Sequence, residues 1–264
     1  MIIKNKTNLV KINRIMYNFY GDCMKLFVTD YDNTLYIDSE SIEKNVKKLQ
    51  ELQENNFYIV ISTGRSLPSI KEKIKEHNIP FDFLTCADGS IIYDKNYNLL
   101  KFYEIKKEII NEVINFKNNI NYEEMQISYS SGYSNILDIE KEISGINVVI
   151  HNNNINNKTI SLFNNIKEKF PNYNYLVYNH EPYSYFCVKQ KGVSKALGIV
   201  YLKEYLEINN QNIYVIGDSD NDLEMLKEFD GACVNNSTQE VLNVCKNHYP
   251  NVSDYIIDIL KDLN

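Results

Sequence analysis

The chain has 264 residues, which is enough for a core domain and a smaller second domain, and its hydrophobic content of 44% suffices to bury both. Its formal net charge of -7 and its pI near 5.2 argue against nucleic acid as the main partner, since the lysines are scattered. The five cysteines lack metal-ligand spacing, so neither a disulfide framework nor a zinc site is expected. The sequence has no apolar run of membrane-spanning length, and we expect a cytoplasmic protein without a membrane partner.

The first 23 residues precede the first strand pattern and carry no apolar core of signal-peptide length. Met24 stands directly before that pattern, which is a natural place for the chain to start. We therefore predict that residues 1–23 are a poorly ordered leader produced by a mis-called start. The alternative is a genuine N-terminal helix over residues 9–20. The N-terminal mass of the natively expressed protein distinguishes the two.

Two carboxylates stand two residues apart where the first predicted strand ends. The apolar run Leu26-Phe27-Val28 leads into Asp30-Tyr31-Asp32-Asn33-Thr34. In an open parallel sheet, ligands bind beyond the carboxyl ends of the strands. One carboxylate at such a place can attack an electrophile while the other gives or takes the leaving-group proton. Asp and Asn also form ordinary turns, so the further segments decide between the two interpretations.

Three further polar segments follow in order, each at the end of a strand pattern or the start of a helix pattern. They are Ser62-Thr63-Gly64-Arg65, Lys191 to Leu197 with Lys195 near the helix start, and Gly217-Asp218-Ser219-Asp220-Asn221-Asp222. Arg65 supplies a guanidinium suited to oxyanions, and Gly64 lets the backbone approach an anion. Two acidic strand ends brought together by a parallel sheet make an oxygen-rich site. Mg²⁺ with retained waters and a substrate phosphate is its natural occupant.

In these motifs the chain resembles the haloacid dehalogenase superfamily, and their order and spacing are similar to those of its class IIB, Cof-type phosphatases. The resemblance covers nearly everything from Met24 onward. It implies a doubly wound α/β core with a parallel, Rossmann-like sheet and an inserted α+β cap domain. It also implies that Asp30 is a nucleophile that forms an aspartyl-phosphate, and that Asp32 is the general acid and base.

The resemblance implies roles for the remaining motif residues as well. Thr63 and Lys195 join the catalytic set, and Thr63, Lys195 and Asn221 contact the phosphate. The residue types of Gly64 and Arg65 add these two to the phosphate or substrate contacts, with support of the cap as the alternative role of Arg65. The Mg²⁺ ligands are Asp30, the carbonyl of Asp32, and Asp218, with Asp222 as support on the metal side. Asp88 stands where relatives usually have asparagine, which leaves open whether it alters substrate preference or forms an ordinary turn before a strand.

Spacing predicts where the cap is inserted. Only about thirty residues separate Asp30 from Thr63, whereas the stretch from Thr63 to Lys195 is far longer than a βα connection needs. That stretch has strand patterns at 90–93, 99–103, 126–129, 148–150, 175–178 and 185–188 and helix patterns at 106–116 and 159–170. We predict a core domain over 24–86 and 190–264 and a cap domain that sets substrate specificity over 87–189.

The predicted function is a Mg²⁺-dependent phosphatase acting on a small phosphorylated metabolite, with sugar phosphates, flavin mononucleotide and pyridoxal phosphate as candidates. One alternative is a phosphotransferase or phosphomutase of the same superfamily, which passes the phosphoryl group to a second substrate. Another is a regulatory protein that binds a phosphorylated metabolite without turnover. Asp32 argues against the second alternative, since a sensor has no need of an acid. The motifs leave substrate identity and oligomeric state open.

Overall fold

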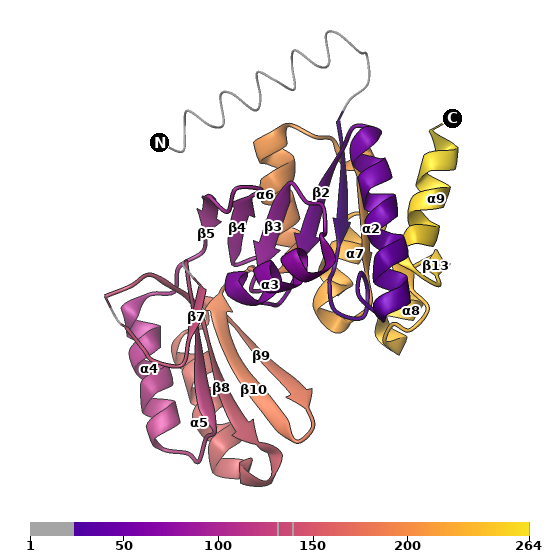
Figure 1. Cartoon of the computed structure of the whole chain (residues 1–264). Coiled ribbons are helices and arrows are strands. Elements are labelled where there is room, and N and C mark those ends of the chain that lie inside the picture. The colour runs from indigo at the N-terminus through magenta and orange to yellow at the C-terminus, as the bar shows by residue number, and fades with distance from the viewer. Residues whose placement is uncertain (1–23, 131, 139, 264) are drawn as a thin grey trace. The chain divides into compact units, whose positions relative to one another are not determined.

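The computed structural model describes residues 24–130, 132–138 and 140–263, so the prediction for the first 23 residues lies outside it. The chain divides into two compact units (Figure 1). We call residues 24–65, 69–100 and 194–263 the core unit, and Ser66–Pro68 with Lys101–Val193 the cap unit. Each unit has its own sheet and its own apolar interior, so each is described separately.

The core unit is built on an eight-stranded sheet with the strand order β13-β12-β11-β1-β2-β3-β4-β5. All pairs from β13 to β3 are parallel, and β4 is antiparallel to β3. The strands are β1 (Lys25–Thr29), β2 (Phe57–Ser62), β3 (Phe83–Cys86), β4 (Ile91–Asp94), β5 (Leu99–Phe102), β11 (Ile213–Gly217), β12 (Ala232–Val234) and β13 (His248–Tyr249). The central strands are continuous apolar runs because helices cover both faces of a parallel sheet.

Helices cover the two faces of this sheet, with α2 and α9 together on one face and α6 and α7 on the other (Figure 1). The helices of the core unit are α2 (Ser39–Glu54), α3 (Leu67–His77, whose first two residues are grouped with the cap unit), α6 (Lys195–Leu206), α7 (Leu223–Glu228), α8 (Gln239–Val244) and α9 (Val252–Asp262), with 3₁₀ turns at Asn210–Asn212 and Asp220–Asp222. Asp38 begins α2 with a capping box, in which its carboxylate accepts from the backbone of Glu40 and Ser41. This doubly wound α/β architecture confirms the predicted fold class.

The strand register places the ends of the central strands side by side. Thr29 at the end of β1 is paired with Ile61 on one side and Ile216 on the other. The residues that follow these strands therefore emerge at the same edge of the sheet, which is the edge where ligands bind in open α/β folds. The pairing continues past the strand ends, since the backbone N–H of Asp30 donates to the carbonyl of Ile216 (3.1 Å).

The cap unit is a two-layer α+β structure. Its five-stranded antiparallel sheet has the order β7-β6-β8-β10-β9, with β6 (Glu124–Tyr129), β7 (Gly132–Ser134), β8 (Ile143–His151), β9 (Tyr173–His180) and β10 (Tyr183–Gln190). Helices α4 (Lys107–Asn118) and α5 (Asn157–Lys169) contribute Val113, Phe116 and Phe163 to the apolar core that they form with the sheet. A 3₁₀ turn at Asn152–Asn154 precedes α5.

The two strand patterns nearest the predicted cap entrance belong to the large sheet. The cap prediction starts at residue 87, whereas β4 and β5 extend the core sheet and the division between the units falls at Leu100 and Lys101. The returning division falls at Val193 and Ser194, compared with 189 and 190 in the prediction. The reason is a turn at Ala87 and Asp88, both with φ near +50°, that folds β4 back against β3.

None of the helices in the described part of the chain is long and apolar enough to cross a membrane.

Candidate active site

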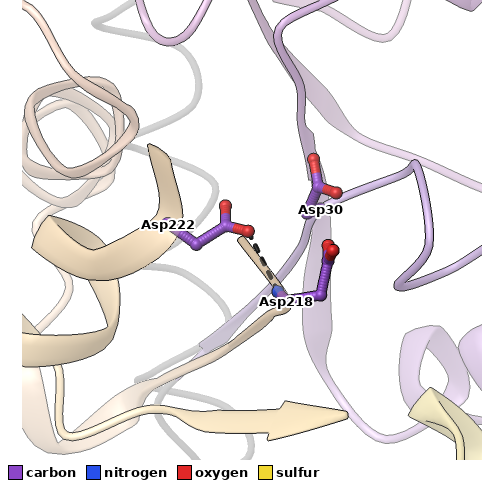
Figure 2. Close-up of side chains that lie close together, drawn as sticks. All are labelled: Asp30, Asp218 and Asp222. Atoms are coloured by element: carbon purple, nitrogen blue, oxygen red, sulfur yellow. Dashed lines mark hydrogen bonds between the residues drawn. The ribbon is translucent and has the colours of Figure 1, made fainter. Parts of the chain in front are cut away.

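Three carboxylates meet at the ligand-binding edge of the core sheet. Asp30 follows β1, Asp218 follows β11, and Asp222 ends the 3₁₀ turn before α7. One oxygen from each lies within 4.8 Å of the others, and all three residues are buried (Figure 2). Parallel strand ends bring Asp30 together with Asp218 and Asp222, which lie 188 and 192 residues further along the sequence, as the sequence predicted for these acidic segments.

Lys195 places a buried cation among these carboxylates. Its Nζ lies 2.6 Å from an oxygen of Asp30 and 2.6 Å from an oxygen of Asp222. The lysine is the first residue of α6, where the helix dipole disfavours a positive charge, so the carboxylates are what stabilise it there. Burial alone lowers the pKa of the ammonium, but Asp222 and Asp30 outweigh burial and raise that pKa above its ordinary value. Lys195 is therefore fully charged at neutral pH.

Asp222 also holds the loop in which Asp218 lies. Its second oxygen accepts hydrogen bonds from the backbone N–H groups of Asp218 (3.0 Å) and Ser219 (3.1 Å). Figure 2 shows the first of these bonds as a dashed line. Gly217 has to be glycine for this packing, because a Cβ there would lie 2.6 Å from the carboxylate carbon of Asp222.

Burial raises the pKa of the other two carboxyl groups. It raises the pKa of Asp30 well above the ordinary value, while Lys195 opposes that shift. It raises the pKa of Asp218 to about 6, against the hydrogen bond that Thr34 donates to this carboxylate (2.7 Å). Thr34 was not singled out from the sequence, although its position at the end of the D-x-D-x-T string was the signal that would have found it.

The chemistry of this donor set fits a divalent cation. Three carboxylates against one ammonium leave an excess of negative charge in a buried place, which is costly unless a further cation is bound. All of the candidate ligands are hard oxygens, which suit Mg²⁺. Asp30 and Asp218 are the carboxylates that would hold it.

Thr63, Gly64 and Asn221 lie at the same edge of the sheet. The hydroxyl of Thr63 accepts a hydrogen bond from the backbone N–H of Arg65 (3.1 Å), and Asn221 donates to the carboxylate of Asp88 (3.0 Å). A Cβ at Gly64 would lie 2.9 Å from the same Asp88 oxygen, so the glycine permits this close approach. Asp88 therefore lies beside these residues and holds the side chain of Asn221 through this hydrogen bond, and its influence on substrate stays a prediction.

Asp32 stands apart from the other acidic side chains. Among the described residues it is not part of the carboxylate cluster, and both of its oxygens accept hydrogen bonds from Arg65. Arg65 was predicted to contact phosphate or substrate, so its pairing with Asp32 is a contact that the sequence did not reveal.

Comparisons with known proteins agree with this site. Residues 27–255 match the haloacid dehalogenase-like hydrolase family, and the chain belongs to that family. As the sequence predicted, it is an enzyme of the phosphatase class and of the Cof type.

Two curated relatives illustrate the similarity. The 5-amino-6-(5-phospho-D-ribitylamino)uracil phosphatase YcsE of Bacillus subtilis is 27% identical over 241 residues, which are 89% of this chain and 90% of that protein. A second Bacillus subtilis phosphatase with the same substrate in its name, YitU, is 20% identical over 79% of this chain and 85% of its own length.

Solved structures share the fold. A haloacid dehalogenase-like hydrolase from Bacteroides thetaiotaomicron superposes with a TM-score of 0.73 at 19% identity, over 89% of this chain and 99% of that one. A protein from Thermotoga maritima gives a TM-score of 0.71 at 19% identity, over 91% and 97% of the two chains.

Proposed function

We propose that this phosphatase is Mg²⁺-dependent and hydrolyses a small phosphorylated metabolite through an aspartyl-phosphate on Asp30. The observation that carries the proposal is the contact of Asp30 with the buried ammonium of Lys195, beside the carboxylate of Asp218. A carboxylate nucleophile repels a phosphate dianion, so the reaction needs fixed positive charge where the two meet. Lys195 supplies one such charge, and the excess of carboxylates calls for another.

In the first step, a carboxylate oxygen of Asp30 forms a bond to phosphorus while the bond from phosphorus to the leaving oxygen breaks. Asp32 gives a proton to that leaving oxygen, and the alcohol departs. The hydroxyl of Thr63 donates a hydrogen bond to the transferring phosphoryl group, and Lys195 balances the charge that develops on it. The burial of Thr63 and Lys195 supports these roles, because hydrogen bonds and charges act more strongly away from water.

In the second step, a water oxygen forms a bond to phosphorus and the bond to Asp30 breaks, which releases inorganic phosphate. Asp32 takes the proton from that water. A Mg²⁺ ion held by Asp30 and Asp218 would supply charge that offsets the repulsion between the phosphate and the carboxylates. Asp222 keeps the Asp218 loop in place through its two backbone hydrogen bonds, and Thr34 fixes the carboxylate of Asp218.

The names of the relatives narrow the choice of substrate. Two of them are phosphatases of 5-amino-6-(5-phospho-D-ribitylamino)uracil. This compound carries a ribityl phosphate chain like that of flavin mononucleotide, which is one of the candidates proposed from the sequence. We therefore place ribityl phosphates with a planar ring first among the substrates to be tested, ahead of sugar phosphates and pyridoxal phosphate.

The test is phosphate release from a panel that contains this uracil compound, flavin mononucleotide, ribitol 5-phosphate, sugar phosphates, pyridoxal phosphate and p-nitrophenyl phosphate. Each substrate is assayed with Mg²⁺ and with EDTA, for the wild type and for Asp30→Asn. The expected result is Mg²⁺-dependent release that disappears in the variant.

Two other results would point to the alternatives. Phosphoryl transfer to an added alcohol in place of water would favour a phosphotransferase or mutase. Saturable binding of a phosphorylated metabolite, with no turnover of any compound by folded protein, would favour a regulatory binder.

A further inference from the structure

Arg65 grips the carboxylate of Asp32 with two parallel hydrogen bonds. Its Nε donates to one oxygen (2.8 Å) and its Nη2 donates to the other (2.6 Å). Such a fork fixes the plane of the carboxylate as well as its distance, which a single point charge does not do. The two residues come from neighbouring strand ends, since Asp32 follows β1 and Arg65 follows β2.

The guanidinium is itself held from two further directions. Its Nη1 donates to the hydroxyl of Ser69 (2.8 Å), and its central carbon lies 5.3 Å from the centre of the Tyr31 ring. Tyr31 is buried and its ring stacks on that of Tyr36, so the ring beneath the guanidinium is itself packed against another side chain. The backbone of Arg65 is anchored too, because its N–H donates to Thr63 and its carbonyl accepts from Ala87. These contacts leave the side chain little freedom.

Stability gives little reason for this arrangement. The side chains of Arg65 and Asp32 are 31% and 47% exposed, and ion pairs with that much access to water contribute little to folding. The contrast with Asp30 points to a division of labour. Asp30 is paired with Lys195 in the buried cluster, whereas Asp32 lies outside that cluster and is paired with Arg65.

We propose that Arg65 is a positioning residue for Asp32, and that its fork determines the direction in which Asp32 meets the leaving oxygen and the attacking water. Each carboxylate oxygen has two lone pairs, so a fork that uses one on each leaves the other to the reaction. This role rests on the proposed function. It differs from the predicted role of Arg65 as a phosphate contact, because the guanidinium acts through Asp32.

The two roles are separated by changing the leaving group. A nitrophenolate departs as a stable anion and needs no proton, whereas an alkoxide needs the proton of Asp32. The experiment compares kcat/KM for p-nitrophenyl phosphate with kcat/KM for the best alkyl phosphate of the panel. For each substrate, kcat/KM reports the steps up to departure of the leaving group. The wild type is compared with Arg65→Gln, Arg65→Lys and the charge control Lys73→Gln, in which an exposed lysine bonded to Glu76 loses its charge.

If Arg65 positions Asp32, Arg65→Gln lowers kcat/KM for the alkyl phosphate about 100-fold and for p-nitrophenyl phosphate less than roughly fivefold. Arg65→Lys regains part of the loss, and Lys73→Gln has no effect. The glutamine variant also shows a first-turnover burst of about one nitrophenolate per enzyme, because Asp32 no longer activates the water that clears Asp30. In the Asp32→Asn background, Arg65→Gln costs little more.

Three results would overturn this role. The first is an equal loss of kcat/KM for both substrates, which is what a direct phosphate contact produces. The second is a loss in the double variant that equals the product of the two single losses. The third is an unfolding midpoint that falls in both Arg65 variants in proportion to their activity, which is what a structural ion pair produces. If the wild type releases no phosphate from any substrate, the proposed function fails first and this role fails with it.

Discussion

The edge of the core sheet and the interior of the cap unit are both buried, yet the first consists of ionisable side chains and the second of apolar ones. Asp30, Asp222 and Lys195 at the sheet edge have ionisable side chains and are no more than 4% exposed. The cap interior is apolar, with the rings of Phe116, Phe163 and Phe186 packed together at centroid distances between 4.9 and 5.8 Å. Burying charge is costly, whereas burying aromatic rings stabilises a fold. The first region is therefore maintained for chemistry and the second for stability.

The strongest way to break this comparison is to change the predicted nucleophile. Asp30→Asn is expected to lower kcat about 10⁴-fold or more, because the amide does not attack phosphorus. Stability is expected to stay the same or to rise in metal-free protein, since one buried carboxylate is removed from a repulsive cluster. The measurements are phosphate release and urea unfolding in EDTA. A loss of activity that is matched by a loss of stability would contradict the assignment.

Removing the buried cation tests the charge balance of the sheet edge. Lys195→Met leaves three carboxylates without their ammonium, and metal-free protein is expected to lose about 3 to 5 kcal/mol of unfolding free energy. Mg²⁺ is expected to restore part of that loss, because it binds only the folded site. Lys203→Met on the same helix is the control. If the unfolding free energy of Lys195→Met is the same in EDTA and in Mg²⁺, the predicted restoration by the metal is contradicted.

A truncation in the cap interior is expected to lower stability and to leave the rate of catalysis nearly unchanged. Ile127 is fully buried in β6, so Ile127→Ala is expected to cost about 2 to 5 kcal/mol, and the control Ile127→Val about 1 kcal/mol. At a temperature where the alanine variant stays folded, kcat for p-nitrophenyl phosphate is expected to change less than roughly threefold. Urea unfolding and steady-state kinetics check this pair, and a large kcat effect in the valine variant would contradict it.

The smallest expected effect is a loss of unfolding free energy in the cap unit at alkaline pH. The hydroxyl of Tyr175 donates to the carbonyl of Phe170 (2.8 Å), and burial raises the pKa of this phenol to about 12. The folded protein therefore holds the proton more tightly than the unfolded chain, whose phenols ionise near pH 10. The stabilisation is fully present below pH 10 and is lost as the pH rises toward 12.

Tyr175→Phe tests whether this tyrosine causes the loss of stability at alkaline pH. Without the hydroxyl, the free energy of unfolding is expected to fall by about 1 kcal/mol at pH 8 and to depend less on pH between 10 and 12. Tyr122→Phe, which changes a more exposed phenol of the same unit, is the control. Unchanged slopes in both variants would show that Tyr175 is not responsible.

The buried carboxylates were predictable from the sequence because they directly follow strands whose ends a parallel sheet aligns. The register of β1 with β2 and β11 fixed the rest, so Asp30, Lys195, Asp218 and Asp222 meet although 192 positions separate the first from the last. The left-handed backbone at Asn33, with φ of 57°, also follows from residue type.

The sequence did not predict contacts that depend on rotamers or on the choice of sheet. The fork between Arg65 and Asp32 needs two particular side-chain conformations at adjacent strand ends, and nothing in the motif encodes them. The strand patterns of β4 and β5 show that these segments are extended but not which sheet they join. The short β7 begins at a glycine and has no alternating pattern of its own.

The central claim is that Asp30 carries the phosphoryl group during turnover. The most direct measurement is to quench the Mg²⁺-loaded enzyme during hydrolysis of p-nitrophenyl phosphate, reduce it with borohydride, and map the modified residue by peptide mass spectrometry. Borohydride converts an acyl phosphate on aspartate to homoserine. The account predicts homoserine at position 30, and none when substrate is omitted. Phosphate release with no homoserine at position 30, or with homoserine at Asp32 or Asp218 instead, would contradict it.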